Sequence, residues 1–174
     1  MYAMFKESGI KEADLSKWDI SKVTSTGNMF DKCANFEYIK TPKGLKTTVS
    51  DADKDFKVVK LKTGSEVTVE HESINLNSSF TVNGNGDKDT AYNIYRKDTH
   101  VGITFDKNGG DTSAFRNHEI AGKGKSIKDS KGSLPEIEPQ KIGYRFTGWA
   151  KSKTAAVPGY DSGSIFRQNG ICGV

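Results

Sequence analysis

Turn-forming residues interrupt this chain so often that long regular elements have little room. The 174 residues include 18 glycines, and many Asn, Asp, Ser, Thr and Lys residues add to the turn chemistry. Hydrophobic residues make up only 34% of the chain and the mean hydropathy is -0.63, so we expect short strands joined by many turns. The 10% of aromatic residues can still offset the entropy of ordering, and a folded chain is expected.

Charge and hydropathy exclude two classes of partner. The net charge of +4 arises from 26 basic and 22 acidic residues spread along the chain, whereas nucleic-acid-binding proteins gather Lys and Arg on one face. No stretch approaches the roughly 20 apolar residues of a membrane helix. We therefore predict neither a nucleic-acid partner nor membrane insertion. The first ten and last six residues carry no secretory signal or wall anchor, so export would require a longer parent chain.

The first region, residues 1–44, contains an internal echo. Met4-Phe5 recurs as Met29-Phe30, about 25 residues later, a spacing within the range of leucine-rich repeats. Three apolar residues spaced by three follow the second copy: Cys33, Phe36 and Ile39. This spacing predicts one apolar side on a short helical or 3₁₀ turn.

These residues resemble the leucine-rich repeats of BspA-type bacterial surface proteins, whose units carry a Met-Phe pair and a Cys three residues later. The resemblance implies that Met29, Phe30, Cys33, Phe36 and Ile39 form the core of one unit. The preceding unit departs from the pattern, because Ser8 replaces its cysteine. With only one to two units present, the region is expected to be the C-terminal end of a longer solenoid.

The second region, residues 45–97, alternates apolar and polar residues in short runs. Examples are Phe56 to Leu61, Val67 to Val69 and Ser79 to Val82. Glycine and asparagine separate these runs, as in Asn83 to Gly86. Period-two alternation with such punctuation predicts antiparallel strands, and we expect a β connector or a small β unit.

The third region, residues 98–174, opens with a strand that enters the turn sequence Asn108-Gly109, of the kind that closes hairpins. Further on, alternation in Gly143 to Trp149 predicts Tyr144 and Phe146 on one face of a strand and Trp149 on the other. Large rings on both faces would each meet protein surface.

This third region resembles the Listeria-Bacteroides repeat, or internalin B-repeat, a small beta-grasp-like module of Gram-positive surface proteins. The resemblance rests on four anchors in order: Phe105 to Gly110, Leu134-Pro135, Gly143 to Trp149, and Tyr160-Asp161. It implies core roles for Phe105, Tyr144, Phe146 and Trp149. The end departs from the family, whose last strand is not matched by Gln168 to Val174.

Candidate catalytic and metal-binding residues form no complete set. Asp51, Asp53 and Asp55 alternate like calcium-loop ligands, but Phe56 and Lys62 occupy the positions that need glycine and a carboxylate. The histidines lie apart and are interpreted as surface or hairpin residues: His71, His100 and His118. Cys33 has no base nearby in the sequence and is expected to be a small buried hydrophobe. We predict no enzyme, no metal and no cofactor.

The sequence thus predicts an α+β, mostly β chain: the end of a solenoid, a β connector and a beta-grasp-like domain. The resemblances imply a non-catalytic extracellular module that acts as a spacer or in adhesion to a host or bacterial surface protein or glycan. Trp18 is the candidate ligand contact. The alternative is a carbohydrate-binding accessory domain of a secreted enzyme, which would expose Trp149 together with Tyr144 or Tyr160.

Overall fold

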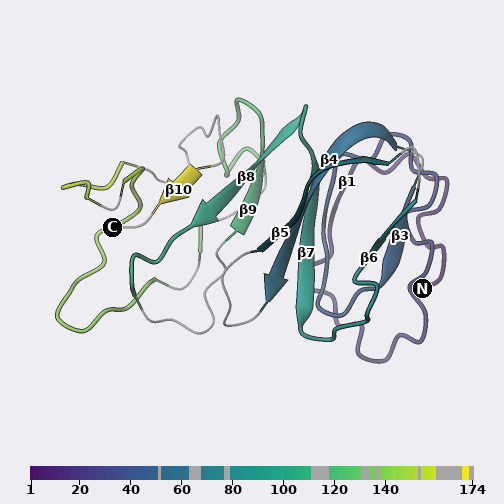
Figure 1. Ribbon diagram of the computed structural model, residues 1–174, viewed down its shortest axis with the longest axis horizontal. Coiled ribbons are helices and arrows are strands. Elements are labelled where there is room, and N and C mark those ends of the chain that lie inside the picture. Colours follow the sequence, from purple (N-terminus) through teal and green to yellow (C-terminus); the bar gives the residue numbers. More distant parts are fainter. Residues whose placement is uncertain are drawn as a thin grey trace. The chain divides into compact units, whose positions relative to one another are not determined.

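A computed structural model describes residues 1–50, 52–62, 68–76, 79–110, 118–130, 134–135, 138–152, 154–159 and 170–172. Within these ranges the chain forms strands and turns and no helix (Figure 1). The described part therefore contains no helix that could cross a membrane. The strands are β1 (Glu12–Asp14), β2 (Tyr38–Lys40), β3 (Thr47–Val49), β4 (Ala52–Lys62), β5 (Thr68–Leu76), β6 (Phe80–Val82), β7 (Thr90–Arg96), β8 (His100–Phe105), β9 (His118–Gly122) and β10 (Gly170–Cys172).

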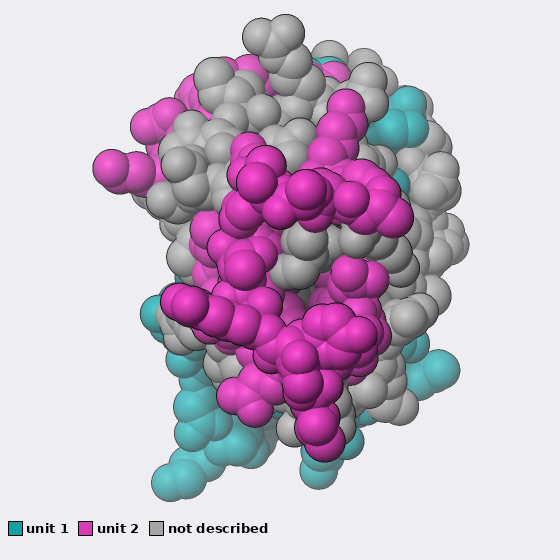
Figure 2. Space-filling view, turned by 90° about the vertical axis from the view of Figure 1, so that its left-hand side faces the viewer, with its two compact units in different colours: residues 1–62, 68–98 teal, residues 63–67, 99–174 magenta. Residues whose placement is uncertain are grey.

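The chain divides into two compact units, which Figure 2 colours separately. Unit 1 comprises residues 1–62 and 68–98, and unit 2 comprises residues 63–67 and 99–174. Unit 1 contains β1 to β7 and unit 2 contains β8 to β10. The second region of the sequence thus contributes β3 to β7 to the same unit as residues 1–44.

Unit 1 is built on a five-stranded sheet in the order β1-β2-β7-β4-β5, and β3 pairs with β6 in a separate ribbon. The long strands β4 and β7 run antiparallel, side by side (Figure 1). Register shifts interrupt the pairing of β4 with β5, and the neighbouring residues Val58 and Val59 are both buried. Such bulges re-aim side chains, which accounts for a break in the predicted alternation.

The two copies of the sequence echo lie against each other in parallel. Glu12 of β1 pairs with Tyr38 of β2. Backbone N–H groups of the first copy also donate to carbonyls of the second: Ala3 to Gly27, Phe5 to Met29, and Glu7 to Asp31. The recurrence therefore corresponds to two layers of chain with equivalent paths.

The predicted α+β fold with a solenoid end is wrong. The described residues contain no helix, and the parallel ladder of β1 and β2 ends where β2 pairs antiparallel with β7. The spacing of Cys33 and Phe36, predicted as a helical or 3₁₀ turn, belongs to a single tight turn in which the Phe36 N–H donates to the Cys33 carbonyl at 3.0 Å. This is the hydrogen bond of a 3₁₀ turn, so that part of the prediction agrees with the structure. Because two layers bury little area alone, antiparallel strands complete the core.

A row of stacked and tilted rings runs through the core of unit 1. The ring centroids of Phe5 and Phe30 lie 5.4 Å apart, those of Phe30 and Phe36 5.5 Å, and those of Phe36 and Phe56 5.9 Å. These separations are typical of favourable aromatic pairs. The row links the echo to β4, and it belongs to a buried cluster that takes residues from six strands, β1 to β4, β6 and β7.

Unit 2 contains a three-stranded sheet in the order β10-β8-β9. β8 pairs antiparallel with β9 and parallel with β10. The predicted turn follows β8: Asn108 and Gly109 both have positive φ, 50° and 76°, and the Gly110 N–H donates to the Lys107 carbonyl. The described part of unit 2 also lacks a helix, so the α+β, beta-grasp-like assignment is corrected there as well.

Candidate functional site

Trp18 reaches the surface because the chain turns sharply after β1. Leu15 is buried beneath this turn, and the Trp18 N–H donates to its carbonyl at 2.9 Å. The next residue, Asp19, accepts a hydrogen bond from the Ser21 N–H at 2.9 Å. This backbone hydrogen bond lowers the pKa of Asp19. An ionised carboxylate therefore follows an exposed indole in the chain.

Three large apolar side chains of unit 1 are exposed, and we call them together the N-terminal aromatic surface: Tyr2, Met4 and Trp18. They are 64%, 51% and 39% exposed. Asn28 holds the Tyr2 hydroxyl by donating from Nδ2 at 3.1 Å. Phe5, next to Met4, lies with its ring centroid 6.4 Å from that of Trp18. Trp18 is thus linked through Phe5 to the buried ring row.

A second cluster joins the two copies of the echo through Asp31. The Ser50 hydroxyl donates to Oδ1 of Asp31, and Lys6 Nζ lies 3.2 Å from Oδ2. The Ser50 hydrogen bond, with a smaller contribution from Lys6, lowers the pKa of Asp31, and the same ion pair raises the pKa of Lys6. The Ser50 hydroxyl, and to a smaller extent Lys6, hold the Asp31 carboxylate ionised, and these contacts tie the loops together.

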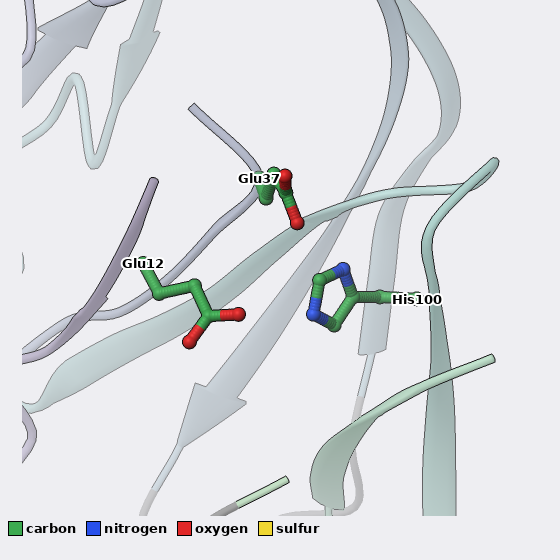
Figure 3. Close-up of side chains that lie close together, drawn as sticks. All are labelled: Glu12, Glu37 and His100. Carbon is green, nitrogen blue, oxygen red and sulfur yellow. The ribbon is translucent and has the colours of Figure 1, made fainter. Parts of the chain in front are cut away.

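A carboxylate pair lies at the start of β1 and just before β2. Oxygens of Glu12 and Glu37 lie within 4.8 Å of each other, and Figure 3 shows the two side chains pointing toward one another. The figure also draws His100, which belongs to unit 2. Within unit 1 the pair supplies two ligand groups, fewer than a calcium or zinc site requires.

The predicted core residues fall into two groups. Seven are buried: Met29, Phe30, Cys33, Phe36, Ile39, Phe105 and Trp149. Cys33 also donates from Sγ to the Phe5 carbonyl at 3.0 Å, and its Sγ lies 3.8 Å from the hydroxyl of Ser8, the residue at the equivalent position of the first copy. Phe146 is half-buried, and Tyr144 is 73% exposed.

The alternation predicted for Gly143 to Trp149 does not hold, because this segment is not an extended strand. Gly148 has a φ of +141° and a side chain there would meet Pro158 at 2.7 Å, so the backbone bends where only glycine fits. The bend brings Phe146 against Trp149, with ring centroids 5.2 Å apart. Tyr144 remains outside, where Lys141 Nζ lies 4.6 Å from its ring centroid. Its assignment to the core is therefore corrected.

Other predicted positions give a mixed outcome. His100 and His118 are buried, so they are not surface residues; they lie on β8 and β9, consecutive strands that pair antiparallel, in agreement with the hairpin alternative. Asp55 is exposed, while Asp51 and the pair Tyr160-Asp161 lie outside the described residues.

Sequence reasoning missed two buried polar residues in the middle of unit 1. Lys40 of β2 is 2% exposed and Asn93 of β7 is 1% exposed. Each is flanked by apolar residues, Tyr38-Ile39 before Lys40 and Ile94-Tyr95 after Asn93. A polar residue within an apolar strand run was the signal that could have marked both.

Comparison with protein families gives one match. Residues 1–61 match the family described as Mycoplasma protein of unknown function, DUF285. The match covers the echo and much of β4 but not unit 2. Searches of the curated proteins and of the solved structures gave no match. The comparisons thus single out the echo-bearing part of unit 1 without assigning it an activity.

Proposed function

We propose that this chain is a non-catalytic extracellular module of a bacterial surface protein, and that it binds a protein or glycan partner through the N-terminal aromatic surface. The observation that carries the proposal is the exposure of Tyr2, Met4 and Trp18 on a unit whose other large rings are packed inside. Exposed aromatic rings contribute strongly to the free energy of binding, because on contact with a partner they bury a large apolar area and lose little conformational entropy.

The two sequence resemblances support the same class of protein. The echo resembles repeats of BspA-type surface proteins, and unit 2 carries anchors that resemble the Listeria-Bacteroides repeat. Both resemblances imply export and a role as spacer or adhesive module. The parallel contact between the two copies of the echo supports the interpretation of residues 1–44 as repeated units.

A carbohydrate-binding accessory domain is the competing function. That proposal required Trp149 at the surface beside Tyr144 or Tyr160, as a platform for sugar rings. Trp149 is 4% exposed and packs edge-on against Phe105, with ring centroids 4.9 Å apart. The platform does not form at that position, and glycan binding would have to use Trp18 instead.

Binding to intact cells tests the proposal. We expect fluorescently labelled protein to bind bacterial or epithelial cells in flow cytometry, and a Tyr2→Ser/Trp18→Ser variant to lose at least about tenfold in affinity, since hot-spot rings each contribute 2 kcal/mol or more. Ile142→Ser, at a fully exposed apolar residue of unit 2, is the matched control and should bind normally. Equal binding by the ring variant and its parent would contradict the proposal, and a glycan array would separate sugar from protein ligands.

A further inference from the structure

We propose that unit 1 forms an intramolecular amide cross-link between the side chains of Lys40 and Asn93, with Asp14 as the acid-base group. The three residues lie on three adjacent strands: Asp14 on β1, Lys40 on β2 and Asn93 on β7. The proposal concerns a covalent modification and is independent of which partner the protein binds.

The register of the sheet places the three side chains in one row. Asp14 pairs with Lys40 in the parallel ladder, and Lys40 pairs with Asn93 in the antiparallel ladder. Directly opposite residues project from the same face, with Cβ atoms about 4.5 to 5.5 Å apart. Lys40 Nζ already lies 3.6 Å from Oδ2 of Asp14. In the register of the sheet, Lys40 thus lies between Asp14 on one side and Asn93 on the other.

The two residues that would be joined are buried, whereas Asp14 is not. Lys40 and Asn93 are 2% and 1% exposed, whereas Asp14 keeps 42% of its side chain exposed. Burial keeps bulk water away from the Lys40 amine and the Asn93 carboxamide, so hydrolysis does not compete with attack by the amine. The exposed carboxylate gives ammonia and protons a route to solvent.

The reaction is an exchange of one amide for another. Asp14 accepts a proton from the Lys40 ammonium, and the Nζ lone pair then attacks Cγ of Asn93. The bond between Cγ and the carboxamide nitrogen breaks as Asp14 returns a proton to that nitrogen. The second proton lost from Nζ passes through Asp14 to the departing ammonia, so that one ammonium ion leaves, a bond between Nζ and Cγ remains, and no oxidant or other reactant is needed.

The mass of the intact protein tests the cross-link. We expect a deficit of about 17 Da, the mass of one ammonia, relative to the sequence, and a branched peptide that joins the segments around Lys40 and Asn93 after digestion. Unmodified linear peptides containing Lys40 and Asn93, recovered in full yield, would overturn the proposal. This measurement needs no variant, so a failure of any variant to fold does not affect it.

Variants then assign the chemistry. Lys40→Arg should restore the full mass, while Lys57→Arg should keep the deficit, because Lys57 on β4 pairs with Tyr95 and not with Asn93. A deficit that persists in Lys40→Arg would overturn the proposal, since ring closure at an Asn-Gly sequence such as Asn108-Gly109 also releases ammonia. Asp14→Asn should abolish or greatly slow the loss of ammonia, and an undiminished deficit there would refute the role of Asp14.

Discussion

The two units stabilise their folds in different ways. Unit 1 spreads its core over many residues, with a row of rings that continues from the echo into β4. The apolar cluster of unit 2 contains six buried residues among those described, and Trp149 is the largest of them. Small domains bury a smaller fraction of their surface. We therefore expect the same kind of core substitution to destabilise the two units by different amounts. The loss in free energy of unfolding should depend on how many neighbouring side chains can repack around the cavity.

Replacing Trp149 with alanine should give the largest effect. Trp149 contacts Phe105 and Phe146 edge-on, and its removal should cost about 3 to 5 kcal/mol of the free energy of unfolding. Urea melts followed by circular dichroism would measure the loss in unit 2. Arg145→Ala is the control, because this exposed side chain should change stability by no more than about 0.5 kcal/mol. A Trp149→Ala protein as stable as its parent would refute the concentrated core of unit 2.

The echo offers a matched pair of methionines that tests unit 1. Met29 is completely buried and Met4 is 51% exposed, although the two occupy equivalent positions in the sequence. Met29→Ala should cost about 2 to 5 kcal/mol, toward the lower end of that range if the distributed core relaxes around the cavity. Met4→Ala should stay within about 0.5 kcal/mol. Equal losses in urea melts would show that the two copies are packed alike, against the observed burial.

Much of the strand content could be predicted from the sequence, because alternation and turn chemistry are local. The runs around Phe56 and Val82 lie on strands β4 and β6, and Asn108-Gly109 forms the expected kind of turn. The order of strands could not be predicted. Nothing local to Tyr38–Lys40 indicates that β2 has a parallel neighbour on one side and an antiparallel neighbour on the other.

The candidate site was only partly accessible to sequence reasoning. Trp18 was identified as a ligand contact from the sequence, but Tyr2 and Met4 were not. Equivalent positions in the two copies of the echo differ in exposure, as Met4 and Met29 do, because different parts of the chain cover each copy. Alternation failed at Tyr144 because Gly148 bends the backbone. The row of Asp14, Lys40 and Asn93 depends on pairing between distant segments, which a single sequence does not reveal.

The smallest expected effect concerns the contact between the two copies of the echo, and it should appear only as a dependence on pH. The Ser50 hydroxyl and then Lys6 lower the pKa of Asp31 in the folded state. A lowered pKa means that the folded protein holds the carboxylate ionised more readily than the unfolded chain does. The contribution to stability is therefore complete above the unfolded pKa of about 3.9, and it is lost as pH falls through the folded value.

Asp31→Asn should be less stable than its parent at neutral pH and should approach the parent in acid, because both then lack the negative charge. Exposed ion pairs contribute little, so the difference should be modest and should come mainly from the Ser50 hydrogen bond. Urea melts at pH 7 and pH 3 would measure it, with Asp89→Asn, at an exposed turn carboxylate, as the control. A stability gap between Asp31→Asn and its parent that stays constant across this range would show that the carboxylate charge does not hold the two copies together.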